Sequence, residues 1–307
     1  MPLVYGGRFG RVSNECRYHY AYDDWQPQAR PSPVSAATSV SAALAKSGLV
    51  PFEARIILGH VLERDRAWLA AHADAMVSAA QAATFEALTR RRHSGEPVAY
   101  LIGHREFFGL DLEITQDVLI PRPETELLVE LAVERIEEVD AARVLDLGTG
   151  SGAIALAIAQ HRPNARVLGI DVSPQAIALA RRNLVRLRIA NAEFMQSDWF
   201  DEVPCETFAQ IVSNPPYVND LDPHLREGDL RFEPPSSLKG GPDGLTAIRA
   251  IVARAPAYLA AKGWLLIEHG YDQAERVQAL LRDARFGDVE SRRDLAGILR
   301  VTFGRVQ

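Results

Sequence analysis

Four consecutive residues, Asn214-Pro215-Pro216-Tyr217, carry the most specific chemical signal in the sequence. They follow an apolar run that predicts a strand, so they would lie at the carboxyl edge of a sheet, where open α/β sheets bind ligands. The Asn214 side-chain oxygen and the Pro215 carbonyl can each accept one N–H of a planar amide or amino group. Pro216 stiffens the loop, and Tyr217 offers a ring to the planar group. The motif therefore favours a site that orients a nitrogen for attack.

A glycine-rich loop with the sequence DLGTGSG, residues 146–152, stands between a predicted strand and a predicted helix. Glycines let the backbone pass close to a ligand, and the amides at the start of the helix face that ligand. We expect a nucleotide-like cofactor there. The loop residues predicted to contact it are Gly148, Thr149, Gly150, Ser151 and Gly152.

Two acidic residues end the next two predicted strands. Asp171 is placed to bind both hydroxyls of a ribose. Asp198 and Trp199, after the third strand, suit an adenine edge and face. Trp199 also fits a purely structural role in the core. The sequence alone favours neither adenine contact nor core packing for this residue.

A nicotinamide-dependent oxidoreductase is an alternative, since Gly148, Gly150 and Ala153 match the dinucleotide-binding pattern G-x-G-x-x-G/A, in which the last position can be alanine. The NPPY motif, however, has no role in hydride transfer. A bound sulfonium donor suits it better, because an amide nitrogen is a poor nucleophile whose lone pair must be aligned with the methyl group. No general base is required, as the proton can leave to water afterwards.

The elements that must position these residues follow from hydrophobic periodicity. Strands and helices alternate from Arg143 onward, which predicts a mainly parallel sheet covered on both faces and closed by an antiparallel hairpin of the last two strands. Residues 34–94 have a helical period and predict four or five short helices. Residues 95–122 predict a hairpin linker about Gly109, with strand-like runs from Tyr100 onward, and a helix begins near Pro123. Residues 1–33 are expected to be a disordered leader, because they lack either period.

Composition narrows the class of protein. The 307 residues suggest two domains, and 47% hydrophobic with 24% charged residues is typical of a soluble protein without a membrane span. A net charge of −6 argues against a surface built to bind nucleic acid. Cys16 and Cys205 have no partners at metal-ligand spacing, so we expect no metal and a reducing cytoplasm.

The sequence closely resembles the peptide chain release factor glutamine methyltransferases, called HemK or PrmC. The resemblance runs from about Val34 to the C-terminus. It is carried by the blocks GEPVAYLIGHREFFGL, VLIPRPETELLVE, VLDLGTGSGAIALAIA, IVSNPPYV, FEPPSSLKGGPDGL and LLIEHG.

The resemblance implies a small all-α N-terminal domain (34–94) that docks the release factor, a β-hairpin linker (95–122), and a Rossmann-like class I methyltransferase domain (123–307) with a seven-stranded sheet. It implies that Gly148–Gly152, Asp171, Trp199 and Asn214 contact S-adenosyl-L-methionine. Asn214, Pro215, Pro216 and Tyr217 would hold the glutamine of a Gly-Gly-Gln loop in class 1 release factors, with Asn214, Pro215 and Tyr217 catalytic. A monomer without nucleic-acid or membrane partners is expected. The PRPET block (121–125) suggests either a pocket wall or a capped helix start.

Three other activities remain open on the residues. Methylation of a ribosomal-protein glutamine shares the core motifs, and only the stretch ARIILGHVLERDRAWL, residues 54–69, favours the release-factor branch. Adenine methylation of nucleic acid can use the same four-residue loop. A non-catalytic binding protein is disfavoured because every motif element is present.

Overall fold

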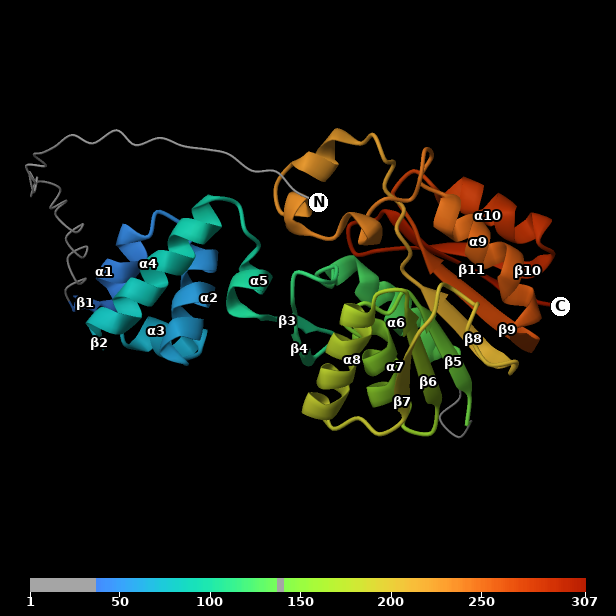
Figure 1. Ribbon diagram of the computed structural model, residues 1–307, viewed down its shortest axis with the longest axis horizontal. Coiled ribbons are helices and arrows are strands. Elements are labelled where there is room, and N and C mark those ends of the chain that lie inside the picture. The colour runs from blue at the N-terminus through green and yellow to red at the C-terminus, as the bar shows by residue number, and fades with distance from the viewer. Residues whose placement is uncertain (1–36, 137–140) are drawn as a thin grey trace, which may run out of the picture.

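The computed structural model describes residues 37–136 and 141–307 of the chain (Figure 1). The leader predicted over residues 1–33 lies outside the described residues. None of the described helices has the length and apolar character needed to span a bilayer.

Four N-terminal helices form the first unit, called here the helical unit. Its elements are β1 (Thr38–Ser39), α1 (Val40–Lys46), α2 (Pro51–Leu62), α3 (Arg66–Ala71), β2 (Met76–Val77) and α4 (Ala79–His93). Local chemistry starts these helices: Pro51 opens α2, and Ser78 forms a capping box with Gln81 at the start of α4. The helices bury a hydrophobic cluster of their own, which includes Ile57, Leu58 and Phe85.

Helix α5 (Val98–Ile102) corrects one prediction, because Tyr100–Ile102 were expected in a strand-like run. Pro97 precedes the helix, and Gly103 ends it in a left-handed conformation, so the segment is capped at both ends. The antiparallel pair β3 (His104–Phe107) and β4 (Leu110–Glu113) then forms the predicted hairpin. Tyr100 packs in the core of the sheet, whereas Leu101 packs in the core of the helical unit.

The remaining chain forms the sheet unit. Its helices are α6 (Glu126–Glu134), α7 (Ala153–His161), α8 (Pro174–Leu187), α9 (Thr246–Arg254) and α10 (Ala274–Asp283). Its strands are β5 (Arg143–Leu147), β6 (Arg166–Asp171), β7 (Ala192–Gln196), β8 (Phe208–Ser213), β9 (Leu259–Glu268), β10 (Phe286–Arg293) and β11 (Leu299–Val306). Single 3-10 turns lie at η1 (Pro123–Thr125), η2 (Pro223–Arg226), η3 (Leu230–Phe232), η4 (Pro235–Ser237) and η5 (Ala255–Ala257).

The seven strands lie in the order β10-β11-β9-β8-β5-β6-β7. The pairs from β9 through β7 are parallel, and β10 and β11 add an antiparallel edge, so the predicted class I methyltransferase sheet is confirmed. The chain runs outward from β5 to β7 and then crosses to β8 on the other side of β5. This reversal opens a crevice beyond the carboxyl ends of β5 and β8.

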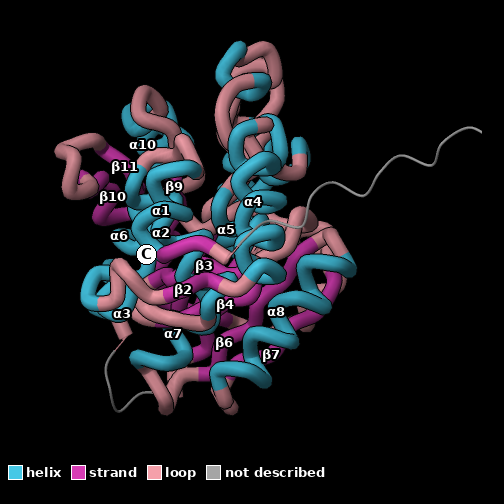
Figure 2. Tube along the Cα trace, turned by 90° about the vertical axis from the view of Figure 1, so that its left-hand side faces the viewer, coloured by secondary structure: helices cyan, strands magenta, loops and turns pink. Residues whose placement is uncertain are grey.

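Successive strand residues face opposite sides of the sheet. Val144 packs with α6, α7 and α8, whereas Leu145 and Leu147 pack with α9 and α10. Figure 1 shows these two helix layers on opposite faces, and Figure 2 shows α7 and α8 lying over β6 and β7. A sheet buried on both faces explains why its strands read as continuous apolar runs.

Several element ends differ from the prediction. The run LTAIRAIVARAPAYL, residues 245–259, predicts one helix to its end. Helix α9 instead ends at Arg254, because Pro256 lacks the N–H that would continue the helix and sits in a 3-10 turn. Strand β7 ends at Gln196, so Asp198 lies two residues beyond the strand instead of at its end.

Candidate active site

A cavity opens at the carboxyl edge of the sheet, where β5, β6, β7 and β8 end. Seven of the residues predicted from the sequence line it together. They are Gly148, Gly150, Asp171, Asp198, Trp199, Asn214 and Pro216. Residues from four separate segments thus meet at one place, as the topological switch point of the sheet requires.

The glycine loop is tied to the neighbouring strand by its backbone. The amides of Gly148 and Thr149 both donate to the carbonyl oxygen of Ile170, at 2.9 and 2.8 Å, and the amide of Gly150 donates to Asp171 Oδ2 at 2.9 Å. The loop therefore presents a fixed backbone surface to the cavity.

The other three loop residues face inward and do not line the cavity. Thr149 donates its hydroxyl to the buried carboxylate of Asp146 at 2.6 Å, and the Ser151 carbonyl accepts from the Asn183 amide at 2.9 Å. A Cβ at Gly152 would come within 3.0 Å of the Phe194 ring. These residues hold the loop and its helix in place, and their predicted cofactor contacts stay predictions.

Asp171 has both carboxylate oxygens oriented by the backbone. Oδ2 accepts from Gly150 and Oδ1 accepts from the amide of Ser173, each at 2.9 Å. Burial raises the pKa of the Asp171 carboxyl above its usual value. A carboxylate held this way retains acceptor capacity for two neighbouring hydroxyls, because each oxygen has a further lone pair.

Trp199 and Asp198 complete this side of the cavity. Trp199 adopts a left-handed backbone conformation with φ of 48° and packs partly against the core cluster of α9 and α10 while it also lines the cavity. The structural and ligand-binding readings of this residue are therefore compatible. Asp198 is exposed at the cavity.

Asn214 is oriented by a residue far away in the sequence. Its Nδ2 donates to the Thr125 hydroxyl at 3.1 Å, and its Oδ1 accepts no hydrogen bond from any described residue. Ser213, just before it, donates its hydroxyl to the Leu147 carbonyl at 2.7 Å, which ties the end of β8 to β5. An amide oxygen is thus available at the cavity wall to accept an N–H.

Tyr217 and Pro215 do not line the cavity. The Tyr217 hydroxyl donates to Glu268 Oε1 at 3.2 Å, and the Tyr217 carbonyl accepts from the Gln273 side chain at 3.0 Å. Pro215 is buried. The Tyr217 contacts hold the NPPY loop from behind. The predicted stacking of Tyr217 and the predicted acceptor role of the Pro215 carbonyl both stay predictions.

Glu268 is the buried charge behind the loop. Its side chain is almost completely buried, and Oε2 has no hydrogen-bond partner within the described residues. Burial raises the pKa of the Glu268 carboxyl to about 7, although Thr125 and Arg300 oppose the shift. Burial also raises the pKa of the Tyr217 phenol, which stays protonated and serves as a donor.

The sequence prediction missed residues on the cavity wall and behind it. Asp117, Val118 and Leu119 from the linker line the cavity, as do Pro234, Ser236 and Ser237 from the segment after the NPPY motif. Thr125 orients Asn214 from behind. The PRPET block indicated that the region of Thr125 matters. The contact between Thr125 and Asn214, however, joins residues 89 positions apart, and no local pattern reveals it.

Comparisons with known protein families cover most of the chain. The family model of the PrmC N-terminal domain matches residues 35–103, and that of the methyltransferase small domain matches residues 124–227. The two matches fall on the helical unit with α5 and on the first part of the sheet unit, which includes the glycine loop and Asn214.

Individual relatives match over nearly their whole length. The release factor glutamine methyltransferase of Burkholderia pseudomallei is 51% identical over 283 residues, covering 90% of this chain and 98% of that protein. The protein of the same name from Escherichia coli is 44% identical over 253 residues, covering 82% and 91%. A solved methyltransferase from Pyrococcus furiosus has a TM-score of 0.50 at 19% identity, covering 70% of this chain and 95% of that one, and shares the fold.

Proposed function

We propose a function that starts from one fact: the chain belongs to the family of release factor glutamine methyltransferases. The enzyme transfers a methyl group from S-adenosyl-L-methionine to the side-chain amide nitrogen of a glutamine in a release factor. The glutamine is that of the Gly-Gly-Gln motif of class 1 release factors. The observation that carries the proposal is the position of Asn214. Its side-chain nitrogen donates to Thr125, which leaves its oxygen available at the wall of the cavity that the glycine loop also lines.

The cavity suits an adenosyl donor. Gly148 and Gly150 offer backbone, Asp171 offers acceptors for ribose hydroxyls, and Asp198 with Trp199 offers an acceptor and a ring for the adenine. Acidic residues also match a donor that carries a positive sulfonium. When bound, that group supplies an electrophilic methyl carbon, so the protein need not activate the donor.

The protein's own residues supply orientation. In the proposed complex, Asn214 Oδ1 and the Pro215 carbonyl each accept one N–H of the target amide, which turns the nitrogen lone pair toward the methyl group. Because the amide nitrogen and the methyl carbon are held in a reactive geometry, the entropic part of the activation barrier for methyl transfer is lowered. The excess proton leaves to water after transfer.

The buried contacts behind the loop keep this geometry fixed. Thr125 holds Asn214, while Glu268 and Gln273 hold Tyr217, so the motif is fastened at its first and last residues. Pro215 and Pro216 restrict the backbone between them. The role proposed for Tyr217 is to position the loop.

The test is mass spectrometry of a purified class 1 release factor after incubation with this protein and S-adenosyl-L-methionine. We expect one added methyl group on the glutamine of the Gly-Gly-Gln motif, and far slower methylation by the Asn214→Ala variant. A ribosomal protein and an adenine-containing oligonucleotide serve as competing substrates. Methylation of either in place of the release factor would overturn the substrate assignment and leave the fold unaffected.

A further inference from the structure

The segment after the NPPY motif leaves the sheet unit and returns to it. This segment, residues 219–239, contains η2, η3 and η4 and is called here the arm. Its two ends meet beside the motif: the Val218 amide donates to the Leu238 carbonyl at 2.9 Å, and the Gly240 amide donates to the Val218 carbonyl at 2.8 Å. The arm is thus a loop whose two ends meet next to Tyr217.

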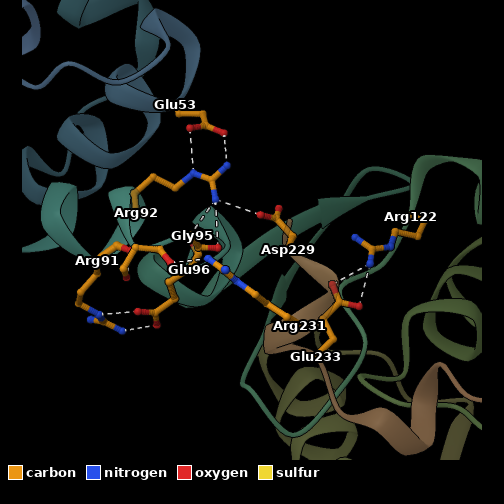
Figure 3. A network of polar contacts seen from close by, with 10 residues as sticks. Glu53, Arg91, Arg92, Gly95, Glu96, Arg122, Asp229, Arg231 and Glu233 are labelled. Atoms are coloured by element: carbon orange, nitrogen blue, oxygen red, sulfur yellow. Dashed lines mark hydrogen bonds and ion pairs between the residues drawn. The ribbon is translucent and has the colours of Figure 1, made fainter. Parts of the chain in front are cut away.

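The outer part of the arm contacts the end of the helical unit (Figure 3). Arg92, near the end of α4, uses Nε and Nη2 to bind Glu53 of α2, at 2.9 and 2.8 Å, and uses Nη1 to bind Asp229 of the arm at 2.9 Å. In the opposite direction, Arg231 of the arm donates to the Ser94 carbonyl at 2.5 Å. One guanidinium therefore links two helices of the helical unit to the arm.

The chain leaves room for this contact at Gly95. A Cβ at this position would collide with Nη2 of Arg231, and the backbone φ of 97° disfavours any other residue. The requirement for glycine comes from this backbone conformation, because the flexible end of Arg231 can shift to admit a Cβ.

The inner part of the arm reaches the cavity. Nη2 of Arg122 binds both carboxylate oxygens of Glu233 at 2.7 Å, and the Glu233 side chain is fully buried. Arg122 lies three residues before Thr125, which orients Asn214. Directly after Glu233, residues Pro234, Ser236 and Ser237 line the cavity. Between Asp229 and Leu238, the arm therefore contacts the helical unit, the cavity and the NPPY loop.

Stability alone does not account for the outer contacts. Asp229 is 44% exposed, and an exposed ion pair adds little to the free energy of unfolding. Such a contact can still fix the orientation of two units, because a planar guanidinium bonded on two edges permits one geometry.

We propose that the outer contacts of the arm, Arg92 with Asp229 and Arg231 with the Ser94 carbonyl, set the orientation of the helical unit relative to the cavity and so determine specificity for a folded protein substrate. This inference rests on the proposed function. A folded substrate that touches the helical unit reaches Asn214 only if the two units keep the matching separation and angle. A short peptide needs the cavity alone and is indifferent to the arm.

The test compares one enzyme on two substrates, a full-length class 1 release factor and a short peptide containing Gly-Gly-Gln. The double variant Asp229→Ala with Arg231→Met removes the outer contacts and leaves Arg122 and Glu233 intact. We expect kcat/KM for the folded release factor to fall about tenfold or more, and kcat/KM for the peptide to stay within about twofold. Glu290→Gln is the matched control, because it removes an exposed ion pair with Arg292 at the far edge of the sheet.

A second readout needs no turnover. Spin labels on exposed Cys205 and on Ala70→Cys of α3, in a chain with Cys16→Ser, report the distance between the two units by pulsed electron paramagnetic resonance. We expect one narrow distance distribution in the labelled parent and a broad one in the double variant.

The outcomes separate the two proposals. An equal loss on both substrates, no loss on either, or an unchanged distance distribution overturns the role of the arm. If the wild-type chain methylates neither the release factor nor the peptide, the proposed function fails, and the distance distributions alone then decide whether the arm fixes the orientation of the two units.

Discussion

The two sides of the cavity are built by different means. The glycine side, comprising Gly148, Gly150, Asp171, Asp198 and Trp199, is held by backbone amides and by the ends of neighbouring strands. The amide side comprises Asn214 at the cavity wall and the residues behind it, Thr125, Tyr217 and Glu268, and it is held by side chains that reach across the fold. The difference indicates a division of labour, in which backbone geometry holds the donor and a side-chain network orients the nitrogen that accepts the methyl group.

Removing Asn214 should break the amide side most severely. In Asn214→Ala the transferring nitrogen loses an acceptor, and we expect kcat to fall about 100-fold or more, because a small misplacement of reacting atoms costs that much. The dissociation constant for S-adenosyl-L-methionine, measured by calorimetry, should change far less. Asn219→Ala is the control, since Asn219 bonds the Pro242 carbonyl in the same loop but does not line the cavity. A similar kcat in the two variants would remove the role assigned to Asn214.

Changing Asp171, on the glycine side, should lower the affinity for the donor more than it lowers kcat. We expect Asp171→Ala to weaken binding of S-adenosyl-L-methionine about 10- to 100-fold, because the ribose hydroxyls lose charge-assisted hydrogen bonds. With saturating donor, kcat should fall by less than the affinity does. Asp201→Ala, at an exposed position bonded to Arg254, is the comparison variant. An unchanged dissociation constant in Asp171→Ala would contradict ribose recognition.

Thr125 offers a milder test of the amide side. In Thr125→Val the shape is kept but the hydroxyl that accepts from Asn214 is lost, and we expect kcat to fall about tenfold with little change in donor affinity. Thr125→Ser restores the hydroxyl and should restore most of the rate. If valine and serine behave alike, the hydrogen bond to Asn214 has no part in positioning.

The smallest expected effect is on the pH dependence of stability. The pKa of the Glu268 carboxyl is raised to about 7 in the folded chain, above its ordinary value of 4.5. A group with a raised folded-state pKa stabilises the fold fully below its unfolded pKa, and this contribution is lost as pH rises toward the folded pKa. Relative to Glu268→Gln, the wild-type free energy of unfolding should therefore decline by roughly 1–3 kcal/mol between about pH 4.5 and 7. Denaturant unfolding across that range measures the difference, and parallel curves for the two proteins would show that Glu268 does not titrate there.

The sequence predicted the glycine side better than the amide side, for a physical reason. The glycine side is marked by local signals. These are the glycines between a strand and a helix and the acid at the end of the next strand, here Asp171, and each can be recognised from a short stretch of sequence. The contacts of Thr125 with Asn214 and of Tyr217 with Glu268 join residues 89 and 51 positions apart, and only the folded sheet brings them together.

The fold itself was predictable where periodicity was clear. The parallel sheet and its closing hairpin follow from apolar runs, and the capping of α8 by Ser173 follows from local chemistry. Helix α5 was missed because five residues are too few to show a period. Its type was decided by Pro97, Gly103 and burial against two cores. The boundaries predicted at residues 94, 95 and 122 stay predictions.

Helix α5 has a consequence for the autonomy of the two units. Leu101 completes the core of the helical unit, whereas the neighbouring Tyr100 lies in the core of the sheet unit and donates its hydroxyl to the Val118 carbonyl at 2.7 Å. A fragment of the helical unit that ends at residue 94 would therefore lack Leu101 from its core. A fragment extended past Ile102 would expose Tyr100, whose packing partners lie in the sheet unit. Because α5 contributes to both cores, its local unfolding would loosen both units at once.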